Sequence, residues 1–195
     1  MAINKLTSLL VMLILALSFQ SFSKADDIRD FQIEGMSIGD SLLNYYNENE
    51  INNNYSKSRI LKGTNYSRSC FIKSNSIYEK LCIDFKNDTN KIIHGVQGVI
   101  RYKKINNPAC LNKLREIDKE FSNIFKNLDR KDWGLLKLPP RPDEDSYYPI
   151  IYKFAVGSKA QIGCYFYKKY DSSHLRVVLY TKEMSKIIKT KAAKK

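Results

Sequence analysis

Four cysteines constrain the fold of this chain more than any other feature of its sequence. All four, Cys70, Cys82, Cys110 and Cys164, follow an N-terminal segment typical of export, and an even cysteine count in an exported protein predicts two disulfides. Cys70 and Cys82 lie equally far from Ser76, so a hairpin turning there places them opposite each other. We therefore expect the bridges Cys70–Cys82 and Cys110–Cys164, each contributing roughly 3–4 kcal/mol. No Cys-x-x-Cys or Cys/His spacing favours a metal site instead.

The export assignment rests on residues 1–25, which contain no acidic residue. Lys5 precedes an apolar run over residues 9–19, and Ser23 and Ala25 are small residues at the −3 and −1 positions of a cleavage site. This is the pattern of a secretory signal peptide cut after Ala25. The alternative is an uncleaved membrane anchor, although a bilayer requires about 20 apolar residues. We expect a periplasmic or secreted mature protein.

The first half of the mature chain, residues 26–105, is expected to contain one helix and three strands. Ser37 followed by Asp40 is a capping-box pattern, and apolar residues then recur at helical spacing, so a helix of about ten residues is predicted from Ser37. It is expected to end in the Asn-rich stretch 47–54. Strand-like runs follow at 66–73, 78–86 and 91–102.

The second half, residues 106–195, repeats this order of elements. Asn107 and Pro108 begin a predicted helix whose apolar stripe runs to Leu128. Strands are predicted at 150–156, 159–168 and 175–180, with Gly157-Ser158 as a two-residue hairpin signal. Thr181 is expected to cap a last amphipathic helix with a basic tail.

A three-stranded sheet with one apolar face needs a helix to cover that face. The sequence therefore predicts an α+β fold of two helix-plus-three-stranded-antiparallel-sheet units, followed by a C-terminal amphipathic helix. The two units are expected to join edge to edge or face to face. Their common order of elements suggests a structural duplication as a hypothesis.

The segment Ile33-Glu-Gly-Met-Ser-Ile-Gly-Asp-Ser-Leu-Leu resembles the opening of certain small exported bacterial proteins. These are the small lipoproteins of the β-barrel assembly machinery and proteins of the β-lactamase-inhibitor-protein-like fold. The chain departs from them in having no lipidated Cys and no Gly-x-Pro after the helix. Over its mature length it resembles uncharacterised small exported bacterial proteins, through Gly35-Met36-Ser37, the 110–117 helix and Cys164. The fold analogy implies binding rather than catalysis.

Few residues in the chain are suited to catalysis or metal binding. The chain has two histidines, His94 and His174. If the turn at Asn90 is a three-residue loop, Asp84 faces His94 across two strands, and a carboxylate that orients an imidazole is half of a catalytic triad. No serine has a nucleophile-elbow context, so a surface cross-strand pair is the alternative for His94 and Asp84. We expect no cofactor and no metal, and we interpret the acidic run 143–145 as a solvated linker.

The formal net charge of +13 and the 13 tyrosines are compatible with binding to nucleic acid, anionic lipid or an acidic glycan. No RNA-binding or helix-turn-helix signature is present, so specific nucleic-acid binding is not expected. The densest basic cluster is C-terminal and can lie on an anionic membrane surface or remain a solvated terminus. Its candidate residues are Lys186, Lys189, Lys191, Lys194 and Lys195.

These features predict an exported, non-enzymatic binding protein of the cell envelope, with an unknown protein or envelope component as partner. Four aromatic residues placed in loops are candidate anchors, because buried aromatic side chains dominate binding energy; alternatively they cover the edge of the core. They are Trp133, Tyr147, Tyr148 and Tyr170. The alternative functions are peripheral binding of an anionic membrane or polyanion through the C-terminus, and a small hydrolase.

Overall fold

The computed structural model describes residues 27–58, 61–74, 76–102, 104–105, 107–138 and 144–192. The predicted signal peptide, Asp143, Lys194 and Lys195 lie outside this range, and the side chain of Lys191 is not described. The larger strands are β3 (Tyr66–Ile72), β4 (Lys80–Lys86), β5 (Ile93–Tyr102), β8 (Asp145–Lys153), β9 (Lys159–Tyr167) and β10 (Ser172–Tyr180). The helices are α2 (Glu48–Asn53), α3 (Asn107–Ile124) and α4 (Lys182–Ala192).

The smaller elements lie at the edges of the molecule. They are the strands β1 (Gln32–Ile33), β2 (Met36–Ser37), β6 (Asp129–Asp132) and β7 (Leu136–Lys137), and the 3-10 turns η1 (Ile28–Asp30), η2 (Leu42–Asn44) and η3 (Lys168–Tyr170). Strands β6 and β7 were not predicted from the sequence. They are short and mostly exposed, and they pair with the outer side of β8.

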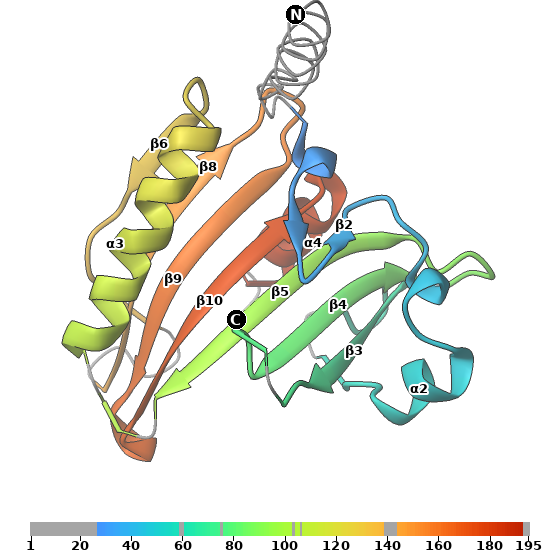
Figure 1. The fold of residues 1–195 in the computed structure, drawn as a ribbon. Helices are drawn as coiled ribbons and strands as arrows, with labels where there is room; N and C mark the ends of the chain where they lie inside the picture. Colours follow the sequence, from blue (N-terminus) through green and yellow to red (C-terminus); the bar gives the residue numbers. More distant parts are fainter. Residues whose placement is uncertain are drawn as a thin grey trace, which may run out of the picture.

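One antiparallel sheet organises the molecule (Figure 1). Its strand order is β3-β4-β5-β10-β9-β8-β6, with β7 also paired to β8. Strands β5 and β10 pair from Gly95↔Tyr180 to Tyr102↔Ser173, so the strands from the two halves of the chain form one continuous sheet. This arrangement confirms the α+β class and joins the two sets of strands edge to edge.

The helix predicted from Ser37 is wrong. Asp40 does accept a hydrogen bond from the Ser37 N–H at 2.9 Å, as in a capping box. However, Gly39 has a φ of +96°, and its N–H donates to the carbonyl of Ile93 in the sheet rather than to a helical partner. Ile38 lies in a turn and Leu42 in η2, and both are buried, whereas Tyr45 is exposed. The capping box of the first half lies instead at Asn47, the N-cap of α2. The first half thus has no counterpart of α3 within the described residues.

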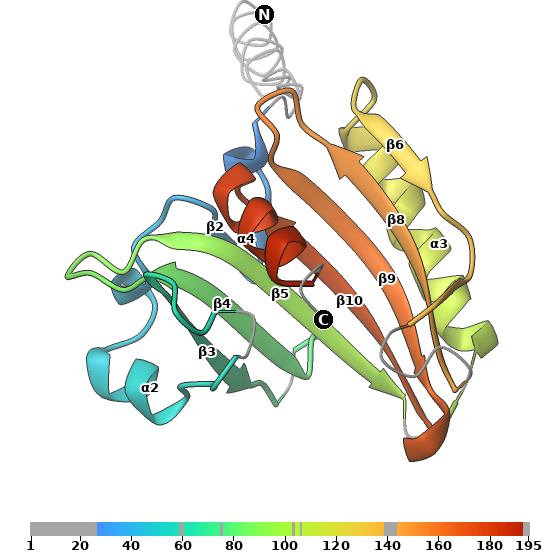
Figure 2. The same ribbon diagram turned by 180° about the vertical axis from the view of Figure 1, so that it is seen from behind.

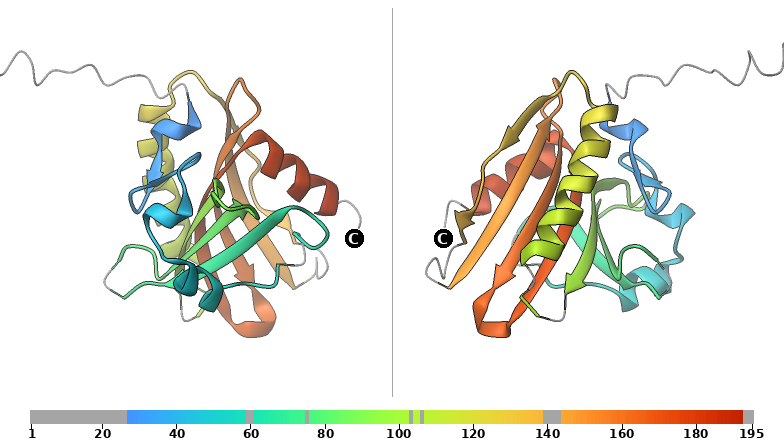
Figure 3. Two further views of the ribbon diagram at one scale, coloured as in Figure 1. Left: turned by 90° about the vertical axis from the view of Figure 1, so that its right-hand side faces the viewer. Right: turned by 60° about the vertical axis from the view of Figure 1, so that its left-hand side comes forward.

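Helix α3 covers β8, β9 and β10 on one side of the sheet, called here the front face (Figure 1). Most of its predicted apolar stripe is buried, with Leu114 and Phe121 almost fully inaccessible, whereas Ile124 in the last turn is exposed. Phe31, which follows η1, packs its ring against Phe121 with centroids 4.8 Å apart. The front face therefore holds the main hydrophobic core, closed by α3, η1 and the β1–β2 hairpin (Figure 3).

The opposite side of the sheet, called here the back face, is covered by a helix at one end only. Figure 2 shows α4 lying over part of β5 and β10, whereas no helix of the described chain lies over the other ends of these strands or of β9 and β8. Under α4, Met184 packs with Leu61, Tyr66, Val178 and Tyr180 in a second, smaller core. The uncovered part of the back face is where polar strand residues collect.

Two other predictions from the sequence need correction. The turn at Gly157-Ser158 is a five-residue loop, because β8 ends at Lys153 and the Phe154 N–H donates to the Ser158 carbonyl at 3.0 Å. Asp145 is not part of a solvated linker, since it is the first residue of β8 and is only 3% exposed.

Candidate functional site

The candidate site is a basic pocket on the uncovered back face. Lys80 of β4 is in register with Val99 of β5, which is in register with Arg176 of β10. Because side chains alternate along a strand, these residues and Arg101 project from the same face. The pocket has a volume of about 220 Å³. Its lining consists of Ser56, Arg68, Cys70, Lys80, Cys82, Gln97, Val99, Arg101, His174 and Arg176.

The pocket contains more positive charge than the neighbouring carboxylates balance. Arg68 is engaged by the buried Asp84, with Nε–Oδ1 and Nη2–Oδ2 distances of 2.6 and 2.7 Å. Burial raises the pKa of Asp84 above its ordinary value, although the hydrogen bonds and charge of Arg68 oppose this shift. Within the described chain, no acidic residue forms an ion pair with Lys80, Arg101 or Arg176.

The positive charge of this pocket lowers the pKa values of Lys80 and His174, in addition to the effect of burial. The pKa of Lys80 is lowered by burial and then by the charges of Arg101 and Arg176. The pKa of His174 falls to about 3, first because of burial and then because of the same arginines and Lys80. Both shifts indicate an unbalanced positive potential in a partly desolvated site. A bound anion would relieve this potential.

A row of aromatic rings borders the pocket on β8, β9 and β10. Tyr147 stacks on Tyr165, Tyr165 on His174, and His174 on Tyr167, with centroids 5.1–5.6 Å apart and planes within 25° of parallel. Arg176 lies 4.3 Å from the centre of the Tyr165 ring, and its Nε donates to His174 Nε2 at 2.7 Å. Since arginine only donates, His174 is neutral with its proton on Nδ1. Tyr165 and His174, the two inner rings of the row, each stack against two neighbouring rings.

A second cavity, of about 520 Å³, adjoins the basic pocket at the edge of β3. The two cavities share Ser56 and Arg68, and Lys57 lines the second one. The basic lining therefore continues beyond the sheet toward residues 55–58 and 61–64.

The catalytic pair suggested by the sequence does not form. A β-bulge between Asp84 and Phe85 places Asp84 opposite Gly95, where its carboxylate binds Arg68. His94 lies instead beside the start of α4, with Nδ1 3.3 Å from Thr181 Oγ1. Burial lowers the pKa of His94. The register shift separates the two side chains that a dyad would require.

The four candidate aromatic anchors do not form one surface. Tyr147 belongs to the back-face row, whereas Tyr148 packs against the front core and donates its hydroxyl to Asp132 at 3.3 Å. Both residues lie in β8, not in a loop. Trp133 follows β6 and Tyr170 lies in η3, both exposed.

Of the C-terminal lysines, Lys186 and Lys189 are exposed on α4. The apolar stripe of the same helix, Met184 with Ile187 and Ile188, packs on the second core. This stripe is therefore directed at the sheet. No helix in the described part of the chain has the length and apolar character needed to span a bilayer.

The basic pocket was not predicted from the sequence. The available signal was the alternation of polar and apolar residues in Lys80-x-Cys82-x-Asp84 and in His174-x-Arg176, which marks one polar face of each strand. The sequence pattern alone does not indicate that these segments are neighbours. Their proximity follows from the strand order, which places β4, β5 and β10 side by side.

Within the described residues, no group of three or more His, Cys, Asp or Glu side chains is arranged to hold a metal ion. Comparisons of the chain with protein-family models, curated proteins and solved structures found no match.

Proposed function

We propose that this protein is an exported, non-enzymatic binding protein of the cell envelope, and that it binds an acidic glycan in the basic pocket. The observation that carries the proposal is the set of three cations, Lys80, Arg101 and Arg176, that lack a carboxylate partner within the described chain. The two disulfides, Cys70–Cys82 and Cys110–Cys164, are compatible with an oxidising compartment.

The repulsion among the three cations favours the binding of an anion. Like charges held together on a partly desolvated sheet face repel one another and do not stabilise the fold. An anionic group that accepts hydrogen bonds from Arg101 and Arg176 converts this repulsion into attraction, because charge-assisted hydrogen bonds are about twice as strong as neutral ones. Arginine presents a planar fork of donors that fits carboxylates and sulfates.

The aromatic row favours a glycan over a single-stranded nucleic acid. Proteins that bind single strands offer open ring faces on which bases stack, whereas Tyr165 and His174 have neighbouring rings on their faces. The pocket offers instead the amide of Gln97 and the hydroxyl of Ser56 beside its cations. Such groups match the hydroxyls and charged groups of an acidic sugar.

An anionic membrane is a less suitable ligand. A helix that binds in the membrane interface inserts its apolar face among the lipids. In α4 that face is engaged with Val178 and Tyr180 of the sheet, so only its exposed lysines remain available. They extend the positive surface without providing an anchor.

The experiment is a calorimetric titration of the folded protein with two hexasaccharides, a carboxylated oligogalacturonate and a sulfated heparin fragment. Lys80→Gln/Arg101→Gln is the test variant, because neither side chain forms a hydrogen bond or an ion pair within the described part of the chain. Arg115→Gln/Lys119→Gln on α3 is the matched control, since it removes the same charge from exposed positions on the opposite side of the sheet from the pocket. Comparison of the two affinities shows whether the pocket prefers a carboxylate or a sulfate.

We expect at least one hexasaccharide to bind the wild type and the control equally, and the test variant to bind roughly 100-fold more weakly. This figure corresponds to two charge-assisted contacts of about 1.5 kcal/mol each. Equal loss in both variants would reveal a nonspecific effect of net charge and refute the proposal. Tighter binding of a charge-matched oligothymidylate or of anionic vesicles would assign the pocket to another class of ligand.

A further inference from the structure

We propose that Cys70–Cys82 is an exchangeable disulfide, attacked selectively by anionic low-molecular-weight thiols that enter the basic pocket. This activity is independent of glycan binding, although both use the positive potential of the same face. The inference rests on three features of the disulfide, namely its accessibility, its charged neighbours and its contrast with the second bridge.

The two disulfides differ in their surroundings. Cys110 and Cys164 join α3 to β9 inside the main core, and both residues are fully buried. Cys70 and Cys82 are register partners on the back face, and both line the basic pocket. Cys70 is only partly buried. A thiol in solution can therefore reach Cys70 in the folded protein, whereas Cys110–Cys164 requires an opening of the core.

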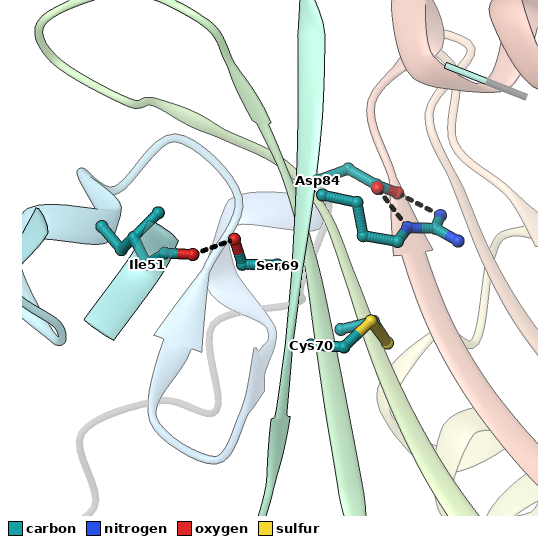
Figure 4. Close-up of a disulfide and its surroundings, with 6 residues drawn as sticks. Ile51, Ser69, Cys70 and Asp84 are labelled. Atoms are coloured by element: carbon teal, nitrogen blue, oxygen red, sulfur yellow. Dashed lines mark hydrogen bonds and ion pairs between the residues drawn. A yellow bond between two sulfur atoms is a disulfide. The ribbon is translucent and has the colours of Figure 1, made fainter. Parts of the chain in front are cut away.

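Cations lie on the same side of the strands as this bridge. Arg68 precedes Cys70 by two residues on β3, and Lys80 precedes Cys82 by two residues on β4. In Figure 4 the disulfide and the Asp84 ion pair project from one side of the strand, whereas Ser69 projects from the other and donates to the Ile51 carbonyl. Burial lowers the pKa of Lys80 most, and the charges of Arg101, Arg176 and Arg68 lower it further, so several cations act at this end of the pocket.

Positive potential assists both halves of thiol–disulfide exchange. The attacking species is a thiolate, and a second thiolate leaves, so nearby cations concentrate the first and stabilise the second. An anionic substituent on the attacking thiol adds a further attraction. The rate should therefore depend on the charge of the thiol, which a merely accessible disulfide would not show.

The small thiol is itself the two-electron reductant, so the exchange needs no other redox reagent. The thiolate sulfur forms a bond to Cys70 Sγ while the Cys70–Cys82 sulfur bond breaks, and the electron pair leaves on Cys82 Sγ as a thiolate. A second thiolate then attacks the small-thiol sulfur of the mixed disulfide. This step releases the small-molecule disulfide, in which the two thiols are oxidised, and leaves both cysteines reduced.

The test treats the folded protein with 2-mercaptoethanesulfonate, 2-mercaptoethanol or cysteamine, which are anionic, neutral and cationic. Thiols formed over time are trapped by alkylation and located by peptide mass spectrometry. Rates are expressed per thiolate, corrected for the intrinsic nucleophilicity of each reagent. Lys80→Gln is the test variant and Lys119→Gln on α3 the charge-matched control.

We expect Cys70 and Cys82 to be labelled roughly ten times faster than Cys110 and Cys164. The anionic thiol should react fastest and the cationic thiol slowest. Molar salt should remove this order in the wild type, and Lys80→Gln should weaken it while the control retains it. Equal labelling of both bridges, or a rate independent of thiol charge and salt, would overturn the proposal. The salt comparison uses the native chain, so it decides the question even if the variant misfolds.

Discussion

Lowering the pH from 7 to 5 should destabilise the protein through His174. The pKa of this imidazole is lowered from 6.5 to about 3 in the folded state by burial and by the neighbouring cations. Between these values the unfolded chain binds a proton that the folded protein excludes. The stabilisation is therefore present above pH 6.5 and is lost as the pH falls. For a single group with these two pKa values, the loss is about 2 kcal/mol between pH 7 and pH 5 and about 4 kcal/mol by pH 3.

The assay is urea unfolding of the wild type and of His174→Asn at pH 7, 6 and 5. Asparagine retains an oxygen that can accept from Arg176, but it does not titrate. The wild type should lose about 2 kcal/mol more than the variant over this range. In parallel, the imidazole Cε1–H resonance of His174 should show no titration above pH 5. A midpoint near 6.5, or equal losses of stability in the two proteins, would refute the reasoning.

Three further substitutions test the packing, each by chemical denaturation. Arg68→Met leaves the buried carboxylate of Asp84 without its partner and should cost about 3–5 kcal/mol; a loss below 1 kcal/mol would contradict the role of this pair. Gly98→Ala places a methyl group 2.5 Å from the Tyr78 ring and should cost about 1–3 kcal/mol, partly recovered by Tyr78→Leu; an unchanged midpoint would show that the ring moves freely. Replacing Cys110–Cys164 by two serines removes a cross-link with a sequence separation of 54 residues and should cost about 4 kcal/mol. A protein of wild-type stability would contradict this expectation.

Local geometry was the part of the fold that could be predicted from the sequence. The equal spacing of Cys70 and Cys82 about Ser76 determined both the hairpin and the pairing of the remaining cysteines, and both bridges are present. The α3 stripe was predictable because its period of three to four residues has no strand equivalent. The helix expected at Ser37 failed because its capping pattern and apolar spacing also suit a sequence of turns, with Gly39 at positive φ.

The basic pocket could not be predicted because it depends on long-range pairing. Lys80 and Arg176 are almost 100 residues apart, and they become neighbours only because β5 lies between β4 and β10. The Asp84–His94 hypothesis assumed an uninterrupted register, and one bulge was enough to give Asp84 a different partner. The C-terminal lysines are dense in sequence and therefore easy to recognise. The pocket cations are far apart in sequence and become neighbours only through strand pairing.

The most direct test of an anion-binding back face is a ¹H–¹⁵N NMR titration of the labelled protein with the acidic hexasaccharide that binds more tightly. The largest shifts should cluster on β4, β5 and β10 around Lys80, Arg101 and Arg176, and they should diminish with salt. Shifts confined to α3 or to α4, or none at saturating sugar, would contradict the account.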